Sequence, residues 1–142
     1  MDFNKLTLKS QEAVGAAQEC VDECVKYAGE RSAFGQPIGR YQAIEFKIAR
    51  MEARAHAART AYYDAAALML AGKPFKKQAA IAKLIASEAA MDNARDGTQI
   101  HGGYGFMNEY PVARHYRDSK ILEIGEGTSE VQLILIAREM GL

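Results

Sequence analysis

Apolar side chains recur at helical spacing along most of the chain. The clearest stripe advances in alternating steps of four and three residues, through Ile44, Ile48, Met51, Ala55, Ala58, Tyr62, Ala65 and Met69. This stripe predicts a helix over about residues 41–71, with a seam suited to antiparallel bundle packing. An earlier stripe predicts a helix that closes at Gly29 and buries Val14, Ala17, Val21, either Cys24 or Val25, and Ala28. Residues 1–10 have no clear pattern, and a frayed start is left open for them.

The second half of the chain repeats this helical character between strong stop signals. An alanine-rich segment predicts a helix over about residues 75–100, with the inward side chains Ile81, Leu84, Ile85, Ala89 and Met91. Two shorter helices are predicted over residues 111–122 and 129–139, and glycine- and proline-rich turns over residues 31–39, 72–74 and 102–105. No alternating strand pattern competes. We therefore expect an all-α, up-and-down four-helix bundle with a short extra helix, forming one domain over residues 1–142.

Charge and composition exclude several classes of function. The 142 residues carry 18 basic and 18 acidic side chains, so nothing favours binding to nucleic acid or to an anionic membrane. No apolar run is long enough to span a bilayer and no signal-peptide pattern opens the chain, so a cytoplasmic protein is expected. Cys20 and Cys24 are read as structural thiols. The histidines lack metal-ligand spacing, and no metal is expected.

One glycine-rich stretch places a carboxylate where a ligand has room to approach. Glu126 stands between Gly125 and Gly127, and Thr128 or Ser129 is suited to cap a following helix. A carboxylate on a loop held between two helices is well placed to meet a substrate. The alternative is a helix-entry loop whose glutamate faces solvent or favours the helix dipole.

Other loop residues suit an anion or a flat ring. Arg31 and Gln42 flank the first loop, and Gln99 precedes the pair Gly102–Gly103. Arginine has a planar fork for phosphate or carboxylate, and adjacent glycines leave backbone amides accessible. A surface ion pair for Arg31 and an ordinary helix C-cap for the glycines remain alternatives. His101 either contacts a ligand or packs as a capping residue.

Three motifs, in order, resemble the C-terminal domain of the acyl-CoA dehydrogenase family. Residues 31–38, Arg-Ser-Ala-Phe-Gly-Gln-Pro-Ile, followed by Gln42, resemble the family's R-x-x-F-G…Q segment. Residues 99–106, Gln-Ile-His-Gly-Gly-Tyr-Gly-Phe, resemble its Q-x-x-G-G-x-G signature. Residues 124–132, Ile-Gly-Glu-Gly-Thr-Ser-Glu-Val-Gln, resemble the loop that holds the catalytic glutamate. The resemblance covers about residues 14–142.

The resemblance implies a flavin-dependent dehydrogenase acting on an acyl-CoA thioester in fatty acid β-oxidation. Glu126 would remove the α-proton while the β-hydrogen leaves as hydride to FAD, and Gly127 would lie against the substrate. The residues implied in FAD binding are Arg31, Phe34, Gln42, Gln99, Ile100, His101, Gly102, Gly103, Thr128, Ser129 and Glu130. Several of these would reach the flavin of a neighbouring subunit in a homodimer or tetramer. Either an electron-transfer flavoprotein or oxygen would reoxidise the flavin.

The sequence also departs from the family pattern. Gly125 replaces the aromatic residue, often tyrosine, that usually precedes the glutamate, which would either enlarge the acyl pocket or loosen the loop. Lys5 and Leu6 stand near the position where some members carry the base, so Glu126 has no rival there. The family's N-terminal helical domain and middle β-domain have no counterpart in these residues. We therefore expect the isolated chain to bind FAD weakly or not at all, and a non-catalytic bundle for assembly or ligand binding is the alternative function.

Overall fold

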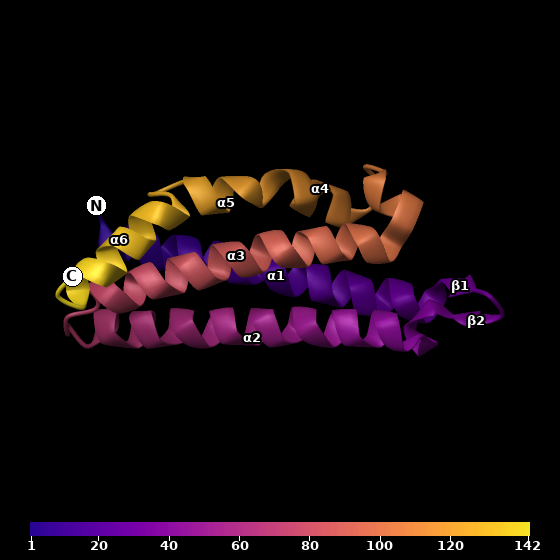
Figure 1. Ribbon diagram of the computed structural model, residues 1–142, viewed down its shortest axis with the longest axis horizontal. Coiled ribbons are helices and arrows are strands. Elements are labelled where there is room, and N and C mark those ends of the chain that lie inside the picture. Colours follow the sequence, from indigo (N-terminus) through magenta and orange to yellow (C-terminus); the bar gives the residue numbers. More distant parts are fainter.

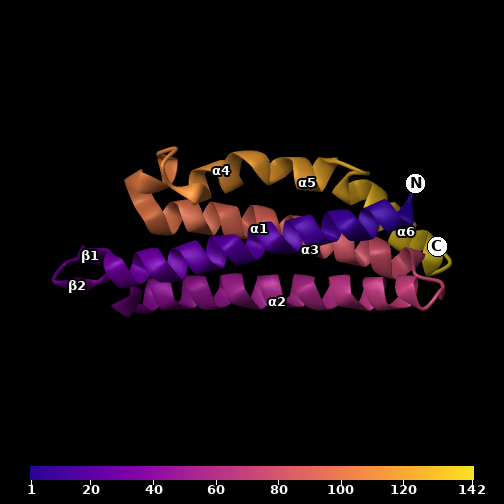
Figure 2. The ribbon, with the colours of Figure 1, turned by 180° about the vertical axis from the view of Figure 1, so that it is seen from behind.

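The computed structural model describes residues 1–142, and its body is three long helices that run up, down and up. These are α1 (Phe3–Glu30), α2 (Gln42–Leu70) and α3 (Lys76–His101). The chain then returns along α3, on the side away from α2, through α4 (Pro111–Asp118), α5 (Lys120–Ile124) and α6 (Ser129–Glu139) (Figures 1 and 2). The expected all-α, up-and-down bundle is confirmed, with its fourth side built from short helices. None of the helices combines the length and the apolar character needed to cross a membrane.

The first helix begins earlier than its apolar stripe suggests. The Asp2 side chain caps α1 by accepting hydrogen bonds from the amides of Asn4 (3.0 Å) and Lys5 (3.3 Å). Leu6 is fully buried near this end of the helix. Because the N-terminal amides have a partner and the first turns are packed, residues 3–10 are helical rather than frayed.

The loop after α1 contains a small hairpin that the sequence pattern did not predict. Strand β1 (Ser32–Ala33) pairs antiparallel with β2 (Gln36–Pro37), and the 3₁₀ helix η1 (Ile38–Arg40) follows. Phe34 and Gly35 form the turn with φ values of 53° and 88°, and positive φ at both central residues is typical of a type I′ turn. Strands of two residues are too short to show alternation, so the expectation of no strand was wrong here.

The segment after α3 is mostly helical, but the helix predicted there is divided at Ser119. A 3₁₀ helix, η2 (Gly102–Phe106), leads to α4. Ser119 separates α4 from α5, although its φ and ψ of −64° and −25° remain helical. The amide of Leu122 donates to the Ser119 carbonyl at 3.0 Å, so the hydrogen bonding tightens to three-residue spacing. The single helix predicted over residues 111–122 is therefore two helices joined at Ser119.

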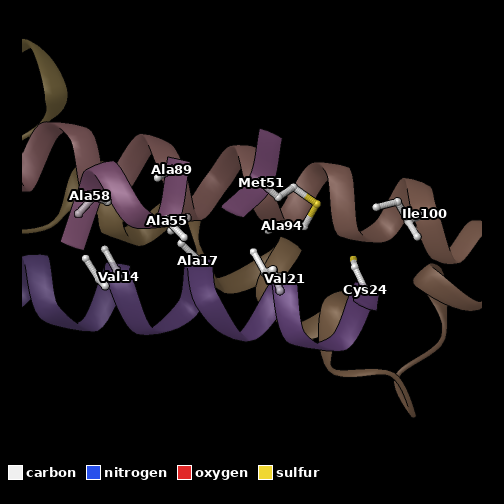
Figure 3. Close-up of a cluster of buried hydrophobic side chains, with 14 residues drawn as sticks. Val14, Ala17, Val21, Cys24, Met51, Ala55, Ala58, Ala89, Ala94 and Ile100 are labelled. Carbon is white, nitrogen blue, oxygen red and sulfur yellow. The ribbon is translucent and has the colours of Figure 1, made fainter. Parts of the chain in front are cut away.

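Small side chains fill the space between the long helices. Figure 3 shows side chains of α1, α2 and α3 converging on one cluster, among them Val21, Met51 and Ala94. The buried face of α3 is mainly alanine: Ala79, Ala80, Ala82, Ala86, Ala89, Ala90 and Ala94. Ala89 is buried as predicted and Ile85 packs against the cluster, but Ile81, Leu84 and Met91 are only half-buried. Alanine lets neighbouring helix backbones approach closely, so the larger side chains lie at the edges of the contact.

Asn93 ties the three long helices together in the core. Its fully buried side chain donates from Nδ2 to the carbonyls of Ala17 on α1 (3.1 Å) and Met51 on α2 (3.0 Å). Its Oδ1 accepts a hydrogen bond from Arg54 of α2 at 3.2 Å. Arg54 also donates to Asp96 of α3 at 2.7 Å. These bonds connect α3 to α1 and α2 in the middle of the bundle.

Candidate functional site

The loop between α5 and α6 holds Glu126 in an uncommon backbone conformation. Glu126 has a φ of 56° and the following Gly127 a φ of 101°. Left-handed angles are unfavourable for a residue with a side chain, and outliers of this kind cluster at ligand-binding sites. The Thr128 hydroxyl accepts a hydrogen bond from the Val131 amide at 3.4 Å, which confirms the expected cap of the last helix. A hydrogen bond with the same hydroxyl lowers the pKa of Glu130.

The polar groups of Glu126 are free to meet a ligand. Its side chain is exposed and makes no hydrogen bond within the chain. The amide N–H groups of Glu126 and Gly127 also donate to no acceptor in the chain. The hydrogen bond and charge of Glu12 raise the pKa of Lys9, and the charge of Glu126 adds to this shift.

Two buried polar side chains support the loop from the protein side. Lys83 of α3 is 2% exposed, and its Nζ donates to the carbonyls of Gly127 (2.7 Å) and Glu123 (3.2 Å). Burial lowers the pKa of Lys83, against the smaller opposing effect of nearby glutamates. Gln132 of α6 is fully buried and donates from Nε2 to the Gly127 carbonyl at 3.0 Å. The Gly127 carbonyl therefore accepts two hydrogen bonds from beneath the loop.

Gly127 also has no space for a side chain. An added Cβ would lie 2.9 Å from Nε2 of Gln132 and 2.7 Å from Cε of Met1. Its φ value and these contacts together explain why glycine occupies the position. Gly125 is different, because its φ and ψ of −64° and 147° suit any residue, although an added Cβ would lie 3.1 Å from the Ile121 carbonyl oxygen.

A second candidate site lies near the hairpin, at the far end of α3. A cleft of about 480 Å³ is lined by Tyr27, Arg31, Ile38, Ile100, His101, Gly102, Gly103, Tyr104 and Met107. The Arg31 guanidinium lies 5.5 Å from the centre of the Tyr104 ring. Gly102 has a φ of 58°, and an added Cβ on either Gly102 or Gly103 would meet nothing within 4 Å. The cleft thus combines aromatic walls, one cation and open backbone.

His101 forms part of the wall of this cleft. Its ring stacks on Tyr27 with centroids 4.1 Å apart, and its Nδ1 lies 2.8 Å from the Gly97 carbonyl oxygen. Burial lowers the pKa of His101, outweighing the hydrogen bond to Gly97. The ring is therefore neutral at pH 7, which leaves Arg31 as the cation that lines the cleft.

The structure divides the predicted site residues into two groups. Arg31, Ile100, His101, Gly102 and Gly103 line the cleft, whereas Glu126, Gly127, Thr128, Ser129 and Glu130 lie near the opposite end of α3 (Figure 1). Phe34 is 97% exposed at the hairpin tip, and Gln42 and Gln99 are exposed without lining the cleft. His101 comes eighteen positions after Lys83, which lies under the Glu126 loop, so the two groups lie about 27 Å apart along α3.

Six residues at these sites were missed by the sequence analysis. Four of them line the cleft, namely Tyr27, Ile38, Tyr104 and Met107, and Lys83 and Gln132 support the Glu126 loop. A usable signal existed for Lys83, since it falls in register with the buried alanine stripe of α3 at four- and three-residue steps from Ala79 and Ala86.

The thiols and the acidic and imidazole groups form no further site. Cys20 and Cys24 are buried and unpaired, and burial raises the pKa of each to about 12. No three His, Cys, Asp or Glu side chains come together as a metal site requires. The chemistry of the chain is therefore concentrated in the Glu126 loop and the cleft.

Comparison with known proteins identifies the family. The protein-family model for the acyl-CoA dehydrogenase C-terminal domain matches residues 8–141. The acryloyl-CoA reductase (NADH) of Anaerotignum propionicum is 50% identical over 129 residues, which are 91% of this chain and 33% of that protein. The butyryl-CoA dehydrogenase structure from Megasphaera elsdenii superposes with a TM-score of 0.95 at 43% identity, over 96% of this chain and 36% of that one. A solved FAD complex of PigA superposes with a TM-score of 0.90 at 30% identity, over 94% and 35%.

These similarities cover nearly the whole chain but only part of each relative. The chain spans about a third of the length of the curated relatives it matches. The match to the family model, together with the shared fold, settles its classification. The chain belongs to the acyl-CoA dehydrogenase family, as a C-terminal helical domain.

Proposed function

We propose that this domain supplies the catalytic base of a flavin-dependent acyl-CoA dehydrogenase. The observation that carries the proposal is the Glu126 loop, which holds a carboxylate in a left-handed conformation with unpaired amides beside it. Strain of this kind persists only where the surrounding structure over-determines it. The order of the three family motifs supports the same assignment.

Each group of the loop has a task in this reaction. The Glu126 carboxylate removes the α-proton of the acyl-CoA thioester, and its amide N–H donates to the thioester carbonyl, which makes that proton more acidic. Gly127 lies against the substrate. FAD, when bound, accepts the β-hydrogen as hydride. If the enzyme works as a reductase, like the relative from Anaerotignum propionicum, the protonated Glu126 carboxyl gives its proton to the α-carbon, and the hydride for the β-carbon would come from reduced FAD.

The base requires a dry environment that this chain does not supply by itself. Glu126 is exposed here, whereas a carboxylate that deprotonates carbon gains basicity when water is excluded. We infer that the walls over the loop come from other domains of the complete enzyme. The isolated chain should then be inactive.

The cleft beside the hairpin fits part of the flavin cofactor. Arg31 offers a guanidinium for a phosphate, the space above Gly102 and Gly103 admits a ligand close to the backbone, and the tyrosines offer flat contacts. Because the cleft and the Glu126 loop are about 27 Å apart along α3, we propose that they serve different copies of FAD. The cleft, with exposed Phe34, would contact the flavin of a neighbouring subunit in a homodimer or tetramer.

The alternative is a bundle that serves only assembly or ligand binding. The exposed side chains of Phe34 (97%) and Phe106 (88%) favour some partner surface on this domain. An anaerobic titration of the isolated chain with FAD and then a short acyl-CoA, followed by flavin absorbance, tests whether the chain is self-sufficient. We expect weak or no flavin binding and no bleaching. Full flavin binding with bleaching would show that the other domains are dispensable.

The decisive test uses Glu126→Gln in the complete enzyme that contains this domain. We expect the variant to bind acyl-CoA while flavin reduction slows by about 10²–10⁴-fold, the usual contribution of a general base. Glu139→Gln, an exposed glutamate at the end of α6, is the control and should reduce flavin normally. Near-normal reduction by Glu126→Gln would place the base elsewhere.

An electron-transfer flavoprotein is the proposed oxidant of the reduced flavin. Adding it after the flavin is reduced tests whether it reoxidises the flavin.

A further inference from the structure

We propose that Lys83 is a positioning residue whose buried ammonium holds the Glu126 loop in its reactive shape. This inference rests on the proposed function, in which Glu126 is the base. Lys83 forms no ion pair with Glu126 or with any other carboxylate. It acts through the backbone instead.

The burial of Lys83 needs an explanation, because it is costly. Its side chain is 2% exposed and lies on the alanine face of α3. An ammonium loses strong hydration when it is buried and is usually compensated by a carboxylate. Here the ammonium donates hydrogen bonds to two carbonyl oxygens instead, those of Glu123 and Gly127. An alanine or methionine would satisfy the packing of this helix face without that cost.

The two carbonyls bracket the loop that carries the base. Glu123 lies in α5 before the turn and Gly127 directly follows Glu126, so one ammonium draws both ends of the segment toward α3. The Gly127 carbonyl is held a second time by Gln132. Holding these carbonyls inward fixes the peptide units 123–124 and 127–128, which lie before and after the turn at Glu126. The arrangement stabilises its left-handed φ and leaves its N–H unpaired.

This role differs from simple attachment of α5 and α6 to the bundle. If Lys83 only held the helices together, its loss would loosen α5 and α6 as a whole and weaken substrate binding with them. If it positions the base, its loss should act mainly on the loop and on the chemical step. Hydrogen bonds from charged donors to carbonyls are strong enough for such an effect to be measured.

The first experiment measures loop order in the isolated chain by amide hydrogen exchange. Lys83→Met keeps the length and apolar stem of the side chain but removes the charge and all donors. We expect exchange to accelerate by about ten- to a hundredfold at Gly125, Val131 and Gln132, whose amides donate the hydrogen bonds that flank Glu126, with little change in the core of α3. The matched control is Lys77→Met, on the same helix, because the Lys77 side chain makes no hydrogen bond within the chain. This variant should leave the loop unchanged. Equal exchange in both variants and the wild type would overturn the proposal.

The second experiment measures the reductive half-reaction in the complete enzyme. For Lys83→Met we expect flavin reduction to slow by about ten- to a hundredfold while acyl-CoA affinity changes by less than about threefold. Gln132→Met, which removes only a neutral donor, should show a smaller effect in the same direction. Loss of affinity in proportion to the rate, or a uniform rise in exchange over α5 and α6, would mean that Lys83 is only structural.

The two proposals fail in different ways. If Glu126→Gln reduces flavin normally, the proposed function fails whatever Lys83 does. If Glu126→Gln blocks reduction and Lys83→Met reduces flavin at the wild-type rate, Glu126 is the base and the positioning role of Lys83 is wrong.

Discussion

Replacing Asn93 by alanine removes the side chain of α3 that hydrogen-bonds to both α1 and α2. Asn93→Ala deletes two hydrogen bonds to backbone carbonyls and one from Arg54. The carbonyl bonds are worth about 1 kcal/mol each, and a bond from a charged donor about 1.5 kcal/mol or more. Because Arg54 keeps Asp96 as a partner, the lower value applies. The free energy of unfolding should therefore fall by about 3.5 kcal/mol.

Urea unfolding of the isolated chain, followed by far-ultraviolet circular dichroism, measures this loss. We expect a lower midpoint with an unchanged slope, since the surface exposed on unfolding is nearly the same. In thermal unfolding the same loss corresponds to a decrease of roughly 10 °C. A double-mutant cycle with Arg54→Ala should give a coupling of about 1–2 kcal/mol, which isolates the contact between the two side chains.

The reasoning would be refuted by an Asn93→Ala variant within about 0.5 kcal/mol of the wild type. Such a result would mean that desolvation of the amide cancels its three hydrogen bonds. Asn93→Leu distinguishes this case, because it fills the volume without any polar group. A Leu variant more stable than the wild type would show that the buried amide is retained for helix register and not for stability.

Two further predictions concern acid stability and a tight glycine. Burial opposes ionisation of Asp96, but hydrogen bonds from its two basic partners outweigh this and hold its pKa below the ordinary value of 3.8. Its contribution to the free energy of unfolding is therefore present above about pH 3.8 and lost as the pH falls through the folded-state pKa. For Asp96→Asn, the urea midpoint should therefore decline less steeply than in the wild type as the pH is lowered below about 3.8. For Gly105→Ala, the added Cβ would lie 2.3 Å from a backbone oxygen of α3, and we expect a loss of about 1–3 kcal/mol. For Gly103→Ala, the added Cβ has open space around it, so the free energy of unfolding should stay within about 0.5 kcal/mol of the wild-type value. Equal losses of stability in the two variants would contradict the steric argument.

Long-range periodicity made most of the fold predictable. The stripe over residues 41–71 has many members at regular spacing, so it predicts α2 almost to its ends. The Thr128 cap was also predictable, since capping depends on neighbouring residues. The hairpin at Phe34 was not, because a two-residue strand has no period to detect.

Burial within α3 shows a second limit of such reasoning. Hydrophobicity points to Ile81 and Leu84 as inward residues, yet the helices approach closely enough that alanine occupies the contact. The position of Lys83 falls in register with the buried alanines, but its charge would assign it to the solvent-exposed face, and its partners lie about forty positions away in the chain. The contact between Tyr27 and His101 likewise joins distant segments of the chain. The candidate base was thus predictable from a local motif, whereas its support and the cleft walls depend on tertiary packing.

The unbroken course of α3 has a consequence for how this domain tolerates insertions and deletions. Helix α3 runs without a break beneath the segment from α4 to α6 (Figure 2). It carries the support of the Glu126 loop near its start and the cleft at its end. A single inserted residue would rotate everything beyond it by about 100° and advance it by about 1.5 Å. An insertion between Lys83 and His101 would leave the Glu126 loop and the cleft each locally intact. It would, however, rotate the cleft to a different side of α3 relative to the loop. Changes of length should therefore be accepted in the turn at Gly72 and at the hairpin tip, and rejected between Lys83 and His101.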